Sequence, residues 1–337
     1  MRITRESLLA LAKTSAADLA GHDRSMICVY LTGSLLEKDF MLGDTADIDL
    51  ICVHGGKCYA PSREVKRVSD EITLDIAHIS DTPFKEPRSL RKDAWLGSFL
   101  WQGVKILFDC EHWFEFVQAG ATAQFMLPEN TLSRARSLAA HARQLWHELD
   151  EQPPDGTTLR LGMFFQALED GGNAIACLSG TPLTLRRFWQ QLPQRAIDAG
   201  APELAGSLQR LVAAELPNDE PWQNWYDQWL KLLDETGKQP KCLAELLPCR
   251  KKYYSEAVSV LRDENPLAAL WILLLTGLKA GRSARSNSLV HKQLAKIAEG
   301  LGFGGGDFAG RLKGLDQWLD NLEFLLEDTS RRNGLEG

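Results

Sequence analysis

The chain has 337 residues, of which 44% are hydrophobic and 25% charged, and its net charge is −7. This length suffices for two or three domains with a sizeable core, and the composition is ordinary for a globular protein. Proteins that bind long nucleic acids usually present a basic surface, so the acidic balance argues against such partners. The seven cysteines include no C-x-x-C pair, which argues against a zinc or redox motif and fits a reducing compartment.

Two segments bear on whether the protein contacts a membrane. The first residues, MRITRESLLALAKTSAADL, lack a continuous apolar core and a cleavage site of small residues, so we do not expect a secretory leader. The most apolar stretch, PLAALWILLLTGL at 266–278, is shorter than the roughly 20 residues of a spanning helix. We therefore expect a cytoplasmic protein without membrane contact and a buried helix at 266–278.

The first third of the chain alternates between helical and strand patterns, as an α/β unit does. Apolar residues on one stripe, among them Leu8 and Leu11, predict a helix over 4–20. Runs rich in Ile, Val and Leu between turn residues predict buried strands. The strands are expected at 26–31, 46–53, 71–80 and 104–109, and a second helix is expected at 90–102.

From about residue 130 the strand patterns fade and helical patterns follow one another, beginning with 131–151 and 157–180. Pro or Gly bounds most of these segments, as expected at helix ends. The sequence therefore predicts an α+β protein, in which a small mixed-sheet domain precedes a mostly α-helical region. We expect a catalytic domain over 1–125, a helical substrate or partner domain over 126–285, and C-terminal helices over 286–337 that pack on it.

Asp47 and Asp49 alternate within the predicted strand ADIDLICV. Side chains of a strand alternate between its two faces, so both carboxylates point the same way and repel each other unless a cation lies between them. Mg²⁺ suits such a site because it takes oxygen ligands and is commonly held by one or two carboxylates. Asp75, in the predicted strand ITLDIAHIS, could complete the cluster as a third ligand or as a base.

Gly33 and Ser34 follow the strand MICVYL after one residue, and twelve residues separate Ser34 from Asp47. Glycine lets the backbone approach a phosphate, and the Ser34 hydroxyl could donate to its oxygens. Each feature has a simpler structural explanation by itself, since tight turns use Gly-Ser and D-x-D pairs occur on solvated sheet edges. The combination with Asp75 points to a metal site that binds a nucleotide.

These positions resemble the signature of the polymerase-β-type nucleotidyltransferase superfamily, in which a Gly-Gly or Gly-Ser pair, a spacer of similar length and Asp-x-Asp or Asp-x-Glu precede a third carboxylate on a later strand. The closest likeness is to small-substrate members, such as aminoglycoside and lincosamide nucleotidyltransferases, and to minimal nucleotidyltransferases. The chain departs from the pattern at Thr32 before the glycine, at Leu35-Leu36-Glu37 where many relatives have an Arg, and at Ala46 where a Ser is common.

The resemblance implies an enzyme that moves a nucleoside monophosphate from a nucleoside triphosphate, with ATP as the expected donor, to a hydroxyl of a small molecule or protein. Asp47, Asp49 and Asp75 would be the catalytic and metal-binding residues, and Gly33 and Ser34 would bind the nucleotide. Two Mg²⁺ ions would take part and pyrophosphate would leave. In some relatives a carboxylate of the helical domain is the base; Glu169 and Asp170 are the candidates here, although a solvated helix face accounts for both.

Several alternatives stay open. The chain could be a non-catalytic or regulatory relative, for example an antitoxin-like component that binds nucleotide or a protein partner, and it could form a homodimer. His54 and His78 could touch substrate, but a surface or capping role is the preferred interpretation for each. Trp222, Trp225 and Trp229 have helical spacing and are expected to form one packed face. Arg186 and Arg187 could contact a nucleotide, but a solvated basic face is the preferred interpretation.

Overall fold

The computed structural model describes residues 3–56, 60–283, 289–304 and 307–335. Its internal contacts divide the chain into two compact units. The first comprises Met1–Phe125 with Lys252–Glu256, and the second comprises Met126–Lys251 with Ala257–Gly337. The three predicted domains stay a prediction, and the boundary expected between 285 and 286 lies outside the described residues.

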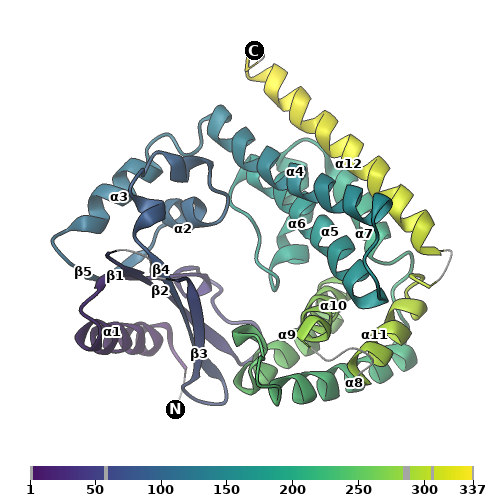
Figure 1. The fold of residues 1–337 in the computed structure, drawn as a ribbon, viewed down its shortest axis with the longest axis horizontal. Coiled ribbons are helices and arrows are strands. Elements are labelled where there is room, and N and C mark those ends of the chain that lie inside the picture. Colours follow the sequence, from purple (N-terminus) through teal and green to yellow (C-terminus); the bar gives the residue numbers. More distant parts are fainter. Residues whose placement is uncertain (1–2, 57–59, 284–288, 305–306, 336–337) are drawn as a thin grey trace. The chain divides into compact units, whose positions relative to one another are not determined.

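A five-stranded mixed sheet forms the centre of the first unit (Figure 1). The strand order is β3-β4-β2-β1-β5. Only the β2–β4 pair is parallel among these strands; the other neighbours are antiparallel. The strands are β1 (Met26–Thr32), β2 (Ala46–His54), β3 (Ser62–Arg67), β4 (Ile72–Ser80) and β5 (Lys105–Asp109).

Helices cover both faces of this sheet (Figure 1). On one face α1 (Arg5–His22) buries Leu8, Ala12 and Ala16 against Ile48 and Leu50 of β2. Thr4 caps this helix, since its hydroxyl accepts from the Ser7 N–H while the Ser7 side chain accepts from the Thr4 N–H. The other face packs under the helices α2 (Leu96–Gln102) and α3 (Trp113–Thr122). The alternation along β2 therefore gives one face to the core under α1 and the opposite face to Asp47 and Asp49.

The second unit is helical. Helix α4 packs along α5 and α12, and α10 packs against α5 and α8. The buried helix expected at 266–278 is confirmed within α10, where Trp271 and Ile272 are fully buried. The helices are α4 (Pro128–Glu151), α5 (Thr157–Ser179), α6 (Phe188–Asp198), α7 (Pro202–Val212), α8 (Asp219–Gly237), α9 (Lys251–Glu264, shared with the first unit), α10 (Pro266–Ser283), α11 (Leu289–Gly300) and α12 (Asp307–Arg332).

The α+β fold class is confirmed, with a small mixed sheet followed by helices. Three elements differ from expectation: the helix α3 (Trp113–Thr122), which was not predicted, and the two that follow. The strand β3 was not predicted, and the segment expected as one helix at 90–102 consists of a 3₁₀ turn at Ser89–Lys92 followed by α2. In the parts of the chain that the structure describes, no helix has the length and apolar character needed to cross a bilayer.

Candidate metal centre

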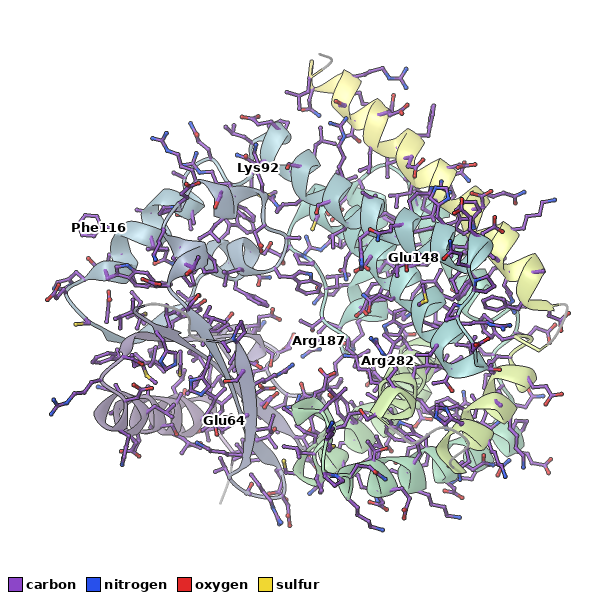
Figure 2. All side chains as sticks on the ribbon, in the orientation of Figure 1. Glu64, Lys92, Phe116, Glu148, Arg187 and Arg282 are labelled. Carbon is purple, nitrogen blue, oxygen red and sulfur yellow. The ribbon has the colours of Figure 1, made fainter. Side chains whose placement is uncertain are left out.

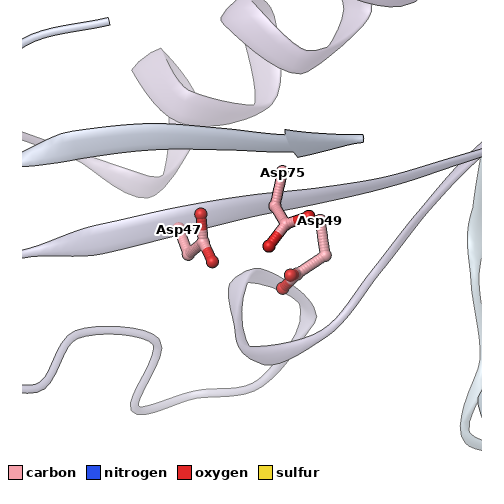
Figure 3. Close-up of side chains that lie close together, drawn as sticks. All are labelled: Asp47, Asp49 and Asp75. Carbon is pink, nitrogen blue, oxygen red and sulfur yellow. The ribbon is translucent and has the colours of Figure 1, made fainter. Parts of the chain in front are cut away.

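The three predicted carboxylates meet on one face of the sheet (Figure 3). The parallel register of β2 and β4 places Asp49 opposite Asp75 and Asp47 opposite Thr73. Residues directly opposite each other in neighbouring strands share a face, so the alternation that pairs Asp47 with Asp49 also brings in Asp75. One ligand oxygen from each carboxylate lies within 4.8 Å of the others. The sequence-predicted set is thus brought together.

Neighbouring side chains hold two of these carboxylates in place. Asp47 is buried and accepts a 2.8 Å hydrogen bond from the Thr73 hydroxyl. Asp75 is buried and accepts from Arg63 on both oxygens, with Nε 2.7 Å from Oδ1 and Nη2 2.5 Å from Oδ2. Neither partner was named from the sequence. Thr73 could have been found, because it precedes Asp75 by two residues and so shares its face.

Gly33 lies directly against the Asp49 carboxylate. Its φ of +80° lies in the left-handed region that glycine adopts without strain. A Cβ at this position would stand 2.8 Å from Asp49 Cγ and closer still to Oδ2. Asp49 therefore occupies space that only a glycine at position 33 leaves open. Two features thus require glycine there: the backbone conformation of the turn and the position of the Asp49 carboxylate.

Ser34 begins a 3₁₀ turn, η1 (Ser34–Leu36), and its hydroxyl donates to the Phe40 carbonyl at 3.3 Å. Its predicted contact with phosphate stays a prediction, since the hydroxyl would have to rotate away from Phe40 to donate to a ligand. Arg5 of α1 fixes the rest of the turn through its donors to the carbonyls of Leu35 and Leu36, at 3.0 and 2.6 Å. The Gly-Ser turn is thus tied to the first helix.

The chemistry of the donor set fits a hard divalent cation. All three donors are carboxylate oxygens, which Mg²⁺ and Ca²⁺ prefer. Two ligands of one Mg²⁺ ion, each about 2.1 Å from it, can be at most about 4.2 Å apart, and the observed spread of up to 4.8 Å exceeds this only slightly. Asp47, Asp49 and Asp75 could therefore hold a metal ion after small side-chain rotations.

The candidate residues of the helical unit differ from expectation. Asp170 is 5% exposed and accepts from His141 Nδ1 at 2.7 Å and from Gln166, so its expected place on a solvated helix face is wrong. Its neighbour Glu169 is half-buried, and burial raises its pKa to about 7, opposed by the positive charge of Lys279. The cause is that α5 packs against several helices at once and leaves few of its positions in water.

The two histidines of the sheet lie on the face opposite the carboxylates. His54 is fully buried, so its expected surface position is wrong. Its Nε2 is 2.9 Å from His78 Nδ1, and its Nδ1 is 2.9 Å from the Ser25 hydroxyl. His78 in turn lies 3.4 Å from Glu64 of β3, which Figure 2 labels. Burial, followed by the charge of His78, lowers the pKa of His54.

The remaining predictions concern packing and charge. Trp222, Trp225 and Trp229 are buried along one side of α8, so the expected packed face is confirmed. Arg186 and Arg187 are half-buried rather than fully solvated, and Arg187, labelled in Figure 2, donates to Gln190. A role of either arginine in nucleotide binding stays a prediction.

No family model matches the chain, and no curated protein matches it either. The crystal structure of a nucleotidyltransferase-like protein from Exiguobacterium sibiricum 255-15 is similar over 97% of this chain and 92% of that chain, with 11% sequence identity and a TM-score of 0.31. Because a likeness at this TM-score carries no argument, the interpretation of the site depends on its own residues.

Proposed function

We propose that this protein is an Mg²⁺-dependent nucleotidyltransferase. It would transfer a nucleoside monophosphate from a nucleoside triphosphate, with ATP as the expected donor, to a hydroxyl of a small molecule or protein, and release pyrophosphate. The observation that supports this proposal is the convergence of Asp47, Asp49 and Asp75 on one face of the sheet, beside a glycine whose missing side chain makes room for one of them.

Each residue of the centre would have a separate role. Asp47 and Asp49 would hold divalent cations, with Asp75 as third ligand or as acceptor of the proton from the attacking hydroxyl. Bound metal ions would supply charge stabilisation for the phosphoryl oxygens and acidify the acceptor hydroxyl. The backbone at Gly33 can come close to a phosphate because it carries no Cβ.

A pyrophosphate-release assay with each of the four nucleoside triphosphates and a panel of hydroxylated acceptors tests the proposal. Asp49→Asn should abolish release, because the change removes a charged ligand but keeps the side-chain shape. Asp44→Asn is the matched control, since this exposed carboxylate lies on the connection that leads into β2 and its loss should leave turnover unchanged. Turnover retained by Asp49→Asn would refute the assignment.

Nucleotide binding separates the enzyme from the non-catalytic alternative. Calorimetry with each nucleoside triphosphate should show binding that depends on Mg²⁺ and is lost in Asp49→Asn, because the carboxylates would hold the metal that bridges to the phosphates. Binding of equal strength with and without Mg²⁺ would contradict the enzymatic proposal. It would favour a regulatory relative that acts by association with a protein partner or with a second copy of itself.

A further inference from the structure

Arg63 is a cation that the structure places against the metal centre. Its guanidinium donates to both oxygens of Asp75 in the side-by-side geometry of a bidentate pair, which is among the stronger arrangements for a carboxylate. The pair joins two adjacent strands, since β3 lies next to β4 in the sheet and Arg63 stands opposite Ala77, two residues from Asp75 and on the same face.

The charges explain why a cation is needed there. Three ionised carboxylates within 4.8 Å of one another would repel strongly in a partly buried site. One guanidinium offsets one of the three negative charges, and a single divalent cation would offset the other two. A metal ion bound to Asp75 would then share this carboxylate with the Arg63 guanidinium. The two positive charges would lie close together and repel each other.

We propose that Arg63 is a built-in counter-charge that competes with divalent cations for Asp75 and so weakens metal binding in the nucleotide-free protein. The inference deepens the proposed function and rests on it, because the metal centre is the one assigned above. Arg63 is thus a positioning residue: it acts through Asp75 and sets how many positive charges the centre accepts.

The two partners differ in their freedom to move, which supports an exchange rather than a permanent pair. The Arg63 side chain is 44% exposed and the Asp75 side chain only 4%. Arg63 also lies on β3, at the edge of the sheet, so the guanidinium can rotate into solvent while Asp75 stays in place. A triphosphate offers the released guanidinium an alternative partner, because Arg binds phosphate as it binds carboxylate.

The competition predicts that metal and nucleotide bind with positive coupling. A nucleotide that draws Arg63 away from Asp75 should raise the affinity for the metal, and by linkage the metal should raise the affinity for the nucleotide. Removing Arg63 should strengthen metal binding in the absence of nucleotide and reduce this coupling, because the competing charge is gone in both states.

The test measures Mn²⁺ binding by the paramagnetic resonance signal of the free ion, with the full chain and without nucleotide. Arg63→Gln should bind Mn²⁺ about tenfold more tightly than the wild type, which corresponds to about 1.4 kcal/mol. Lys66→Gln is the matched control: Lys66 lies on the same strand with a similarly exposed side chain, 51%, but pairs with Glu64. Its removal should leave the affinity within twofold of the wild type.

A second variant keeps the proposal falsifiable if Arg63→Gln fails to fold. Arg63→Lys retains the charge but replaces the two-pronged donor with a single ammonium, and its Mn²⁺ affinity should lie between those of the wild type and Arg63→Gln. Circular dichroism of each variant without metal shows whether it is folded.

Two results would overturn the inference in distinguishable ways. If wild-type binding is lost in Asp49→Asn but Arg63→Gln and Arg63→Lys both bind Mn²⁺ no more tightly than wild type, the role of Arg63 is refuted and the metal centre stands. If neither wild type nor Arg63→Gln shows Mn²⁺ binding that depends on Asp49, the metal centre itself is refuted, and the proposed function fails with it.

Discussion

Gly33 and Asp49 share one space: the carboxylate of Asp49 lies where the Cβ of any other residue at position 33 would stand. The pair joins the turn after β1 to the middle of β2, whose register sets Thr32 opposite Asp49. A motif glycine is usually explained by backbone freedom alone. Here it also fixes the position of a metal-ligand candidate.

Gly33→Ala should therefore damage the centre more than the fold. The added methyl group would push the Asp49 carboxylate out of the cluster, and we expect Mn²⁺ affinity to fall at least tenfold. A non-glycine residue at φ +80° and ψ −167° also costs about 1 to 3 kcal/mol in unfolding free energy. Calorimetric titration and urea denaturation measure the two effects separately.

Gly103→Ala is the control for backbone strain. Gly103 has a φ of +98°, and apart from its two chain neighbours no described residue has an atom within 4 Å of the position that a Cβ would take there, so this change should lower the unfolding free energy without lowering Mn²⁺ affinity. If both alanine variants bind Mn²⁺ as the wild type does, steric exclusion by Gly33 does not position Asp49.

Thr73→Val tests the hydrogen bond that orients Asp47. Valine keeps the shape and the β-branch of threonine, which suits a strand, but removes the hydroxyl that donates to Asp47 at 2.8 Å. Loss of one donor to a buried carboxylate should cost about 1 to 3 kcal/mol of stability, and metal affinity should drop about tenfold, as for other partners of ligands. Thr73→Ser retains the donor and should keep most of the stability and metal affinity of the wild type. Equal metal affinity in the wild type, Thr73→Val and Thr73→Ser would exclude an orienting role of the Thr73 hydroxyl.

The sequence was sufficient to predict the strands that carry the centre. β1, β2 and β4 are apolar on at least one face and bounded by turn residues, and that pattern predicts buried strands whatever their partners are. The position of Asp47 and Asp49 on one face followed from the two-residue period alone. The two-residue period does not determine the order of the strands. It could therefore not predict that β4 lies next to β2 and places Asp75 opposite Asp49.

The strand β3 could not be predicted because it lies at the sheet edge. Its sequence, SREVKR, has a single buried residue, Val65, and charged side chains at most other positions. Charged residues on an edge strand discourage pairing with other chains, and they also remove the hydrophobic pattern by which strands are recognised. Arg63, the partner of Asp75, was missed for this reason.

His54 should make the unfolding free energy depend on pH in the acid range. Burial and the neighbouring His78 lower its pKa in the folded state below the ordinary 6.5, so the folded protein resists a proton that the unfolded chain accepts. The stability that this group contributes is complete above about pH 6.5 and is lost as the pH falls through the folded-state pKa. Denaturant titrations at several pH values between 5 and 8 should show the loss, and His54→Gln should reduce it.

The exposed His22, at the end of α1, is the control for this change. His22→Gln should change the slope less than His54→Gln does, because the His22 side chain stays exposed in the folded protein and, among the described residues, its ring has only the Asp18 carbonyl of its own helix as a hydrogen-bond partner. An unchanged slope in His54→Gln would show that other groups account for the acid sensitivity.

Glu169 should give the opposite pH dependence in the helical unit. Burial raises its pKa from 4.5 to about 7, so the folded state holds a proton that the unfolded chain releases. This contribution to stability is complete below about pH 4.5 and is lost as the pH rises through about 7. Glu169→Gln, which is neutral throughout, should therefore be more stable than the wild type at pH 8 by at most about 3.5 kcal/mol, at about 1.4 kcal/mol per pKa unit, and nearly equal to it near pH 4.5. The exposed Glu148 of α4 (Figure 2) provides the control Glu148→Gln, which should follow the wild type at both pH values. An equal gain in the two variants would mean that removal of surface charge, rather than relief of the half-buried Glu169 carboxylate, stabilises the protein.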